Sequence, residues 1–350
     1  MFIDVKFETI EDDPKYVLID VRSEGEYIEA TIPNAINIPL FNNEERAKVG
    51  TVYKQKGPDK ARELGLTIVS PKIPSLVKQV RDSLIDGQVP LFFCWRGGMR
   101  SKSMATFYGL IYNHTYRLEG GYRAYREYIL SRIPLMTIHI PSFVLHGMTG
   151  VGKTQLLHGL KKQGFTILDL EGLAGHRGSA FGAIGTQPAN QKTFDSNLYE
   201  TLKEIHKSDA VILEAESQRI GKIIVPDQIM EAKENGQHIL VHANTHTRVS
   251  RILEEYQLDK YKEPFVSGIE RIERKLPTEI RPMIQESLEV NDFYTVVKLL
   301  LEHYYDPRYQ FSTDQYQGPF FEVNSDLLND AVEKIGQYIQ GKVKITSLQL

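Results

Sequence analysis

Short apolar runs alternate with stretches of helical period through the first third of the chain. Runs of strand length occupy Tyr16–Val21 and Val89–Cys94, and a further strand is expected in the segment TYRLEGG. Apolar residues recur every three or four positions in Ser75–Gly87, in Ser101–Tyr112 and in the segment YRAYREYIL, a pattern typical of amphipathic helices. This alternation predicts a parallel sheet with helices on its faces.

A segment of different character follows. Ser131–Ser142 contains two prolines and no helical period. We therefore predict a domain boundary there, with one domain over residues 1–136 and a second over residues 137–350.

The second domain begins another α/β pattern. Its expected strands are the segment SFVLHG and the runs Phe165–Leu170, Asp209–Ser217 and Gln237–Asn244. After about Thr245 the chain is expected to be helical and charged. The predicted fold class is α/β, with two parallel-sheet domains and a helical C-terminal part.

Composition narrows the class of protein. The 350 residues are 41% hydrophobic and 25% charged, which is typical of a globular protein with room for two cores. No run approaches the roughly 20 apolar residues of a membrane span, and the N-terminal segment lacks a signal-peptide pattern. One cysteine cannot form an internal disulfide, so we expect a cytoplasmic protein with no membrane partner. The net charge of −3 means that an RNA partner needs a local basic surface.

The single cysteine lies in a loop suited to nucleophilic chemistry. Cys94 directly follows an expected strand, and Arg96, two glycines and Arg100 precede a helix that begins near Ser101. N–H groups of a tight turn and of a helix N-terminus carry partial positive charge, which favours the nucleophilic thiolate. We therefore predict that Cys94, Arg96 and Arg100 are catalytic.

Two chemistries share this kind of loop. A sulfurtransferase carries a persulfide on its cysteine, whereas a cysteine phosphatase binds phosphate with residues spaced like Cys94 and Arg100. The spacing alone does not decide between them. The upstream segment LIDVRSEGEYIEATIPNAINIP resembles the opening of a rhodanese domain, although Thr31 stands where many rhodaneses have His. Within it, Asp20 and Arg22 are expected to stabilise the fold rather than to take part in chemistry.

The segment GMTGVGKT has the pattern of a phosphate-binding loop. It follows an expected strand and precedes the expected helix KTQLLHGLKKQG, which is the context that such a loop requires. Backbone N–H groups would surround a phosphate, the lysine would neutralise it, and the threonine would bind Mg²⁺. We predict that a diphosphate binds to Gly147, Gly150, Gly152, Lys153 and Thr154.

An acidic residue and a glycine-rich segment accompany this loop. Glu214 ends the run AVILE, where a carboxylate normally supports the metal or its water, although an ordinary strand-end residue would look the same. The segment DLEGLAGHRGSAFG contains Asp169, His176 and Arg177 beside an expected strand end, and we interpret it as a substrate loop. No His/Cys cluster has metal-ligand spacing, so we expect no tightly bound cofactor and no fixed metal site beyond Mg²⁺ near Thr154.

Several phrases occur in an order that is specific. The rhodanese-like opening, CWRGGMRS, RLEGGY, HGMTGVGKT, DLEGLAGHRGSAFG and EAESQRIG together resemble the bacterial tRNA 2-selenouridine synthase family, over about Val17 to Val225. The resemblance implies a rhodanese-like parallel-sheet domain followed by a P-loop NTPase-like α/β domain with a helical C-terminal part. The C-terminal third carries no motif of its own.

The resemblance also implies an activity. The family converts 2-thiouridine at the tRNA wobble position to 2-selenouridine: the sulfur is first alkylated by geranyl diphosphate, and selenium from selenophosphate then displaces geranylthiol. The phosphate-binding loop would hold the prenyl diphosphate. Cys94 would serve the selenium step, either by binding selenophosphate or by carrying a perselenide. The implied partners are tRNA, geranyl diphosphate and selenophosphate.

Two other classes of function share these motifs. One is a P-loop kinase or ATPase with a rhodanese domain as redox sensor, and the other is an ATP-dependent tRNA sulfurtransferase. The nucleosides of tRNA from cells that lack the protein would distinguish the three.

A tRNA partner requires a basic face on an acidic chain. Helical spacing would place Arg271, Arg274 and Lys275 on one side of a helix, and Arg248 and Arg251 have similar spacing. A solvated face paired with Glu270 and Glu273 explains the same pattern equally well. An alternative basic surface consists of Arg117, Arg123 and Arg126.

Overall fold

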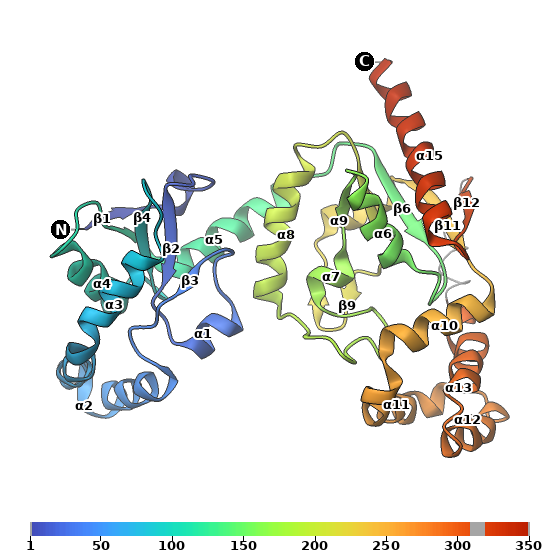
Figure 1. Cartoon of the computed structure of the whole chain (residues 1–350), viewed down its shortest axis with the longest axis horizontal. Coiled ribbons are helices and arrows are strands. Elements are labelled where there is room, and N and C mark those ends of the chain that lie inside the picture. The colour runs from blue at the N-terminus through green and yellow to red at the C-terminus, as the bar shows by residue number, and fades with distance from the viewer. Residues whose placement is uncertain (1, 309–318, 349–350) are drawn as a thin grey trace. The chain divides into compact units, whose positions relative to one another are not determined.

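The computed structural model describes residues 2–308 and 319–348, and Figure 1 shows the arrangement of the elements. The chain forms two compact units. One holds Met1–Ile133 with Asp195–Asn197, and the other holds Pro134–Phe194 with Leu198–Leu350. The units part within the proline-containing segment Ser131–Ser142.

The first unit is built on a five-stranded parallel sheet with the order β1-β5-β4-β2-β3. Its strands are β1 (Ile3–Val5), β2 (Tyr16–Asp20), β3 (Ile36–Asn37), β4 (Val89–Phe93) and β5 (Tyr116–Leu118). Its helices are the short 3₁₀ helix Phe7–Thr9, α1 (Glu24–Glu29), α2 (Asn43–Val69), α3 (Ile73–Asp82), α4 (Met99–Gly109) and α5 (Gly121–Arg132). The central strand β4 is apolar on both faces because helices cover both.

Helix α2 is interrupted in its middle. Gly57 has a left-handed backbone with φ of 85°, and Pro58 follows it. Proline lacks an N–H donor and excludes the helical conformation at the residue before it, so the helix divides into two arms at this point.

The second unit also has a five-stranded parallel sheet, with the order β12-β11-β6-β8-β7. The strands are β6 (Ser142–His146), β7 (Thr166–Leu168), β8 (Val211–Glu214), β11 (Gln237–His242) and β12 (Phe321–Asn324), and β9 (Arg219–Ile220) pairs separately with β10 (Ile223–Ile224). Helices α6 (Lys153–Lys162) and α15 (Leu328–Leu348) contribute to one core against the sheet. The connection from β6 leads to β7 on one side of it, and the connection from β8 leads to β11 on the other side of β6, so ligands are expected beyond the carboxyl ends of these central strands.

The remaining helices complete this unit. They are α7 (Leu170–Ala174), α8 (Gln191–Ile205), α9 (Asp227–Glu234), α10 (Thr245–Tyr256), α11 (Leu258–Ile272), the 3₁₀ helix Glu273–Lys275, α12 (Ile280–Glu289), α13 (Phe293–Leu300) and the π-helical turn Leu301–Tyr305. Helices α10 to α13 share a separate apolar core that includes Phe181 and Phe265.

The predicted fold class is confirmed: two parallel α/β units are followed by a helix-rich C-terminal part. The expectation of helix alone after Thr245 was wrong in one place, because β12 lies in that region and extends the sheet beside β11. Within the described residues, no helix combines the length and the apolar character needed to cross a membrane.

Candidate active site

The cysteine lies at the carboxyl end of β4, facing the first turn of α4. Its Sγ accepts a hydrogen bond from the Gly98 N–H at 3.2 Å and lies 3.2 Å from Ser101 Oγ. Gly97 has φ of 63°, and a Cβ there would lie 3.2 Å from the Leu118 carbonyl oxygen, so the turn requires glycine. Cys94 is buried, but a cavity of about 360 Å³ opens beside it. The loop therefore offers N–H groups and a thiol to an anion.

The two arginines of the loop differ in their surroundings. Arg96 is exposed and lines the cavity beside Cys94. Arg100 also lines it, but donates to both carboxylate oxygens of Glu26, at 2.5 and 3.1 Å. Burial opposes ionisation of Glu26, but the hydrogen bonds and charge of Arg100, with the Ser23 N–H and the charge of Arg46, together outweigh it and lower the pKa of that carboxyl. Because its charge is paired, Arg100 is a poorer phosphate ligand than the phosphatase-like spacing indicates.

Asp20 and Arg22 form a buried ion pair. The Arg22 guanidinium donates to Asp20 at 2.6 Å and to the Ala30 carbonyl at 2.7 Å, and Thr31 Oγ1 donates to Asp20 at 2.9 Å. Asp20 and Arg22 are 0% and 2% exposed, so neither can reach a ligand in solvent. This arrangement fits the expected role in stabilising the fold.

The phosphate-binding loop connects β6 to α6. Gly147, Gly150 and Gly152 all have positive φ, of 152°, 83° and 90°. A Cβ at Gly147 would lie 2.5 Å from the Val241 carbonyl oxygen, so the loop packs too closely for any side chain there. Lys153 Nζ donates to the Gly147 carbonyl at 2.9 Å, and Thr154 Oγ1 donates to Glu214 at 3.1 Å. The predicted loop residues thus come together at the N-terminus of α6, where the helix dipole favours anions.

Carboxyl groups cluster beside Thr154. Glu214 is fully buried, and burial together with the charge of Glu171 raises its pKa well above the ordinary value. Burial and the charge of Glu216 raise the pKa of Glu171 to about 8. Both shifts arise chiefly from burial and then from the neighbouring carboxylates, and the charge of Lys153 opposes them only in part. The sequence interpretation singled out Glu214 and missed Glu171 and Glu216, although both lie within the phrases DLEG and EAES.

The glycine-rich segment lies beside these carboxyls, since a Cβ at Gly178 would lie 2.6 Å from Glu171 Oε1 and 2.9 Å from Glu216 Oε2. Asp169 caps α7 by accepting from the Gly172 N–H at 2.7 Å. Arg177 donates to the Ile184 carbonyl at 2.7 Å and pairs with Glu255 at 2.6 Å. These contacts use Asp169 and Arg177 to hold the segment in place.

His176 differs from its neighbours in this segment. Its Nδ1 is buried and makes no hydrogen bond to any described residue, and burial lowers the pKa of the ring. Of the three predicted residues of the segment, His176 is the one whose side chain has a buried polar atom without a hydrogen bond to a described residue.

Two arginines proposed for an RNA surface lie instead beneath the phosphate-binding loop. Arg248 Nε donates to the Thr149 carbonyl at 2.9 Å, and Arg251 Nη1 donates to the Val151 carbonyl at 2.8 Å. They are 4% and 9% exposed. Assigning them to an RNA-binding face was therefore wrong. The face of α10 that carries them packs against the phosphate-binding loop and donates hydrogen bonds to its carbonyl groups.

Two protein-family models match the chain, one over each unit. The AAA domain described as that of tRNA 2-selenouridine synthase matches residues 140–342, and the rhodanese-like domain matches residues 6–128. The chain belongs to the tRNA 2-selenouridine synthase family. Each matched domain covers most of one unit, and the two follow in the order expected from the sequence.

Three curated tRNA 2-selenouridine synthases illustrate the relationship. The protein of Nitrosomonas europaea is 30% identical over 95% of this chain and 89% of its own length. That of Hydrogenovibrio crunogenus is 32% identical over 89% of this chain and 94% of its own. That of Shewanella woodyi is 30% identical over 86% of this chain and 89% of its own.

Proposed function

We propose that this chain converts wobble 2-thiouridine of tRNA to 2-selenouridine through an S-geranyl intermediate. The observation that carries the proposal is the presence of two distinct glycine-containing loops, one with Cys94 and one with Lys153, each at the carboxyl end of a parallel strand in a chain of this family. Two loops suit a reaction that consumes two anionic donors, a prenyl diphosphate and selenophosphate.

The first step is assigned to the phosphate-binding loop. The thiocarbonyl sulfur attacks C1 of geranyl diphosphate, a C–S bond forms, the C–O bond breaks, and pyrophosphate leaves while N3 of the base loses its proton. Lys153 and the loop N–H groups stabilise the charge that develops on the pyrophosphate. This role needs no ATP.

Magnesium suits the oxygen-rich donors of this site. The Thr154 hydroxyl and the Glu214 carboxyl lie 3.1 Å apart at the start of α6. Mg²⁺ is usually held by one or two protein oxygens together with substrate phosphates, and Thr154 and Glu214 are the protein oxygens that would hold it here. Mg²⁺ would neutralise diphosphate charge when bound.

The second step is assigned to the cysteine loop. Selenophosphate selenium attacks C2 of the base, the C2–S bond breaks, and geranylthiol leaves with a proton. Water then cleaves the P–Se bond and releases phosphate. Selenium remains at the selenide level throughout, so no oxidant is needed. A perselenide on Cys94 would need one, and we therefore assign Cys94 to binding and orienting selenophosphate with the Gly98 N–H.

The test is the nucleoside content of tRNA. Cells that lack the protein should contain 2-thiouridine but neither 2-selenouridine nor its S-geranyl precursor, and the gene should restore both. Unchanged 2-selenouridine in the deletion strain would overturn the proposal. Loss of 2-thiouridine itself would favour an ATP-dependent sulfurtransferase.

A further inference from the structure

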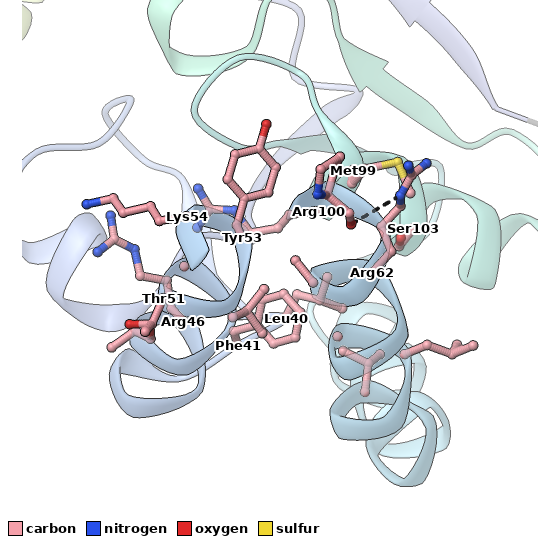
Figure 2. A pocket seen from close by; sticks show the side chains of 18 of the residues that line it. Leu40, Phe41, Arg46, Thr51, Tyr53, Lys54, Arg62, Met99, Arg100 and Ser103 are labelled. Carbon is pink, nitrogen blue, oxygen red and sulfur yellow. Dashed lines mark hydrogen bonds between the residues drawn. The ribbon is translucent and has the colours of Figure 1, made fainter. Parts of the chain in front are cut away.

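A large cavity lies in the first unit, between the two arms of α2 and the start of α4. Its volume is about 1030 Å³, and its base includes Leu40 and Phe41 (Figure 2). Met99 and Arg100 line both this cavity and the smaller one beside Cys94, so the two spaces adjoin.

The wall of the cavity exposes apolar side chains. Tyr53, Leu66 and Met99 are 59%, 61% and 56% exposed, and all three line it. Single exposed apolar residues are ordinary, but a concave group of them marks a site for an apolar ligand.

We propose that this cavity binds the geranyl group of the S-geranyl tRNA intermediate while selenium is delivered beside Cys94. The inference rests on the proposed function and assigns a place to its lipophilic intermediate. A ten-carbon chain attached to the base would enter the large cavity as C2 approaches the cysteine loop. Its burial would also hold the departing geranylthiol away from water.

Size favours this location over the apolar cavity at the phosphate-binding loop. The apolar cavity next to Thr149, at the phosphate-binding loop, has a volume of about 20 Å³, which is room for roughly one water molecule. The cavity beside α2, at about 1030 Å³, lies at the upper limit of the range of about 300–1,000 Å³ that is typical of small-ligand sites.

The charge around the cavity favours an apolar group that is attached to a polyanion. Exposed Arg46 and Lys54 come from the first arm of α2, and Arg62 comes from the second. Such a rim suits an RNA backbone around a buried hydrocarbon chain. Arg46 pairs with Glu26 at 3.6 Å and Arg62 pairs with Asp59, so part of this charge is offset, and Lys54 is the rim cation with no ion pair among the described residues.

The test fills the cavity without disturbing the helix. Gly50 lines the cavity within α2 at ordinary helical φ, and a Cβ there meets no atom within 4 Å. Gly50→Phe therefore occupies the space, and Gln55→Phe is its control, because Gln55 is exposed on the same helix and does not line the cavity. The probes are anticodon stem-loop RNAs that carry S-geranyl- or S-methyl-2-thiouridine, offered to the full chain.

Binding is measured first. Each buried methylene is worth roughly fourfold in affinity, so burial of only three or four of the nine additional carbons should make wild type prefer S-geranyl RNA over S-methyl RNA by on the order of 100-fold. Gly50→Phe should reduce that preference at least tenfold and leave the affinity for S-methyl RNA unchanged. Gln55→Phe should change neither the preference nor the affinity for S-methyl RNA. Equal affinities of wild type for the two RNAs, or equal loss of both in Gly50→Phe, would overturn the inference.

A second pair of variants covers the case in which Gly50→Phe fails to fold. Leu66→Gln polarises the cavity at an exposed position, and Leu110→Gln is a control that is 79% exposed and outside the lining. Leu66→Gln should selectively weaken the binding of S-geranyl RNA, and Leu110→Gln should not.

Single-turnover selenation with selenophosphate separates this inference from the proposed function. Absence of selenation of both RNAs by wild type would count against the proposed function, while the binding preference would still decide the cavity. Loss of geranyl transfer to 2-thiouridine RNA in Gly50→Phe, with S-geranyl RNA binding intact, would assign the cavity to the first step and overturn the inference.

Discussion

Cys94 and Lys153 each lie where a buried parallel strand gives way to the N-terminus of a helix, and each belongs to a different unit of the chain. Cys94→Ser should abolish selenation and leave geranylation, because the serine hydroxyl keeps the shape of the loop but not the thiol. S-geranyl-2-thiouridine should then accumulate in tRNA. A folded variant that also fails to geranylate would show that the assignment of steps is wrong.

Lys153→Ala should slow geranyl transfer by about 30- to 1,000-fold, because removing one such charge from a preorganised site costs roughly 2–4 kcal/mol of transition-state stabilisation. Lys161→Ala, at the exposed end of the same helix, is the control. Geranyl transfer is measured with 2-thiouridine RNA and geranyl diphosphate. If transfer is unchanged while ATP hydrolysis is lost, the ATPase alternative is favoured.

Glu171 gives a stability that depends on pH. Its pKa is about 8 in the folded chain against an ordinary 4.5, so the folded state binds more protons than the unfolded state between these values. The free energy of unfolding should therefore decrease as pH rises from about 4.5 to about 8. Glu171→Gln removes this group and should flatten the decrease by at least half, measured by denaturant titration across that range. An unchanged pH profile would show that Glu171 is ionised in the fold.

Some residues of the candidate site were accessible from the sequence and others were not. The spacing of Lys153 and Thr154 is local, and Glu214 ends a recognisable apolar strand, so the motif brings them together in the fold. Glutamate is a common residue type, and the neighbours of Glu26 and Glu171 in the sequence do not by themselves mark either as a site residue. Their contacts with Arg100 and with the buried carboxyls depend on tertiary packing, which no local pattern reports.

Strands and helices differ in how readily they could be predicted. Buried parallel strands such as β4 and β8 consist of continuous apolar runs, so they were predicted closely. β12 has the short sequence FEVN and pairs with a strand about 80 residues earlier, so only the sheet identifies it. Helical spacing correctly placed Arg248 and Arg251 on one face of α10, but spacing does not reveal whether a face is buried.

The burial of Arg248 leads to a prediction for the phosphate-binding loop. Arg248→Gln removes the donor to Thr149 and the ion pair with Asp306, which is 2.6 Å long. We expect a loss of roughly 1–3 kcal/mol in stability, because a buried charge-assisted contact is broken. Geranyl diphosphate affinity should also weaken, since the loop loses a support. Arg271→Gln, at an exposed position, is the control, and equal affinity and unfolding free energy in the two variants would contradict this role.

At the scale of the whole molecule, the sequence was enough to predict the fold class and order of the two units. Apolar runs of strand length alternate with helical stretches in both, and each unit carries its own motif, the cysteine loop or the phosphate-binding loop. The surface that binds tRNA does not follow in this way, because the chain carries a net charge of −3 and its cations are dispersed. Of the alternative basic group, Arg117 pairs with Asp4 and Arg123 with Glu127. That pairing leaves less free charge there than the spacing indicates.

Arg271, Arg274 and Lys275 are exposed at the end of α11 and in the 3₁₀ turn that follows. In the described part of the chain no ion pair joins them to Glu270 or Glu273, so their charge is available to phosphate groups.

Each phosphate contact contributes about 0.9 to the slope of log affinity against log salt. Replacing all three with glutamine should weaken binding of full-length tRNA and reduce that slope by up to about 3, whereas Lys161→Gln with Lys162→Gln should not. Turnover of a short anticodon-loop fragment should barely change, because the fragment lacks the tRNA body that a separate basic face would contact. Equal salt slopes for wild type and the triple variant would exclude this face and direct attention to the surface around Arg117 and Arg123.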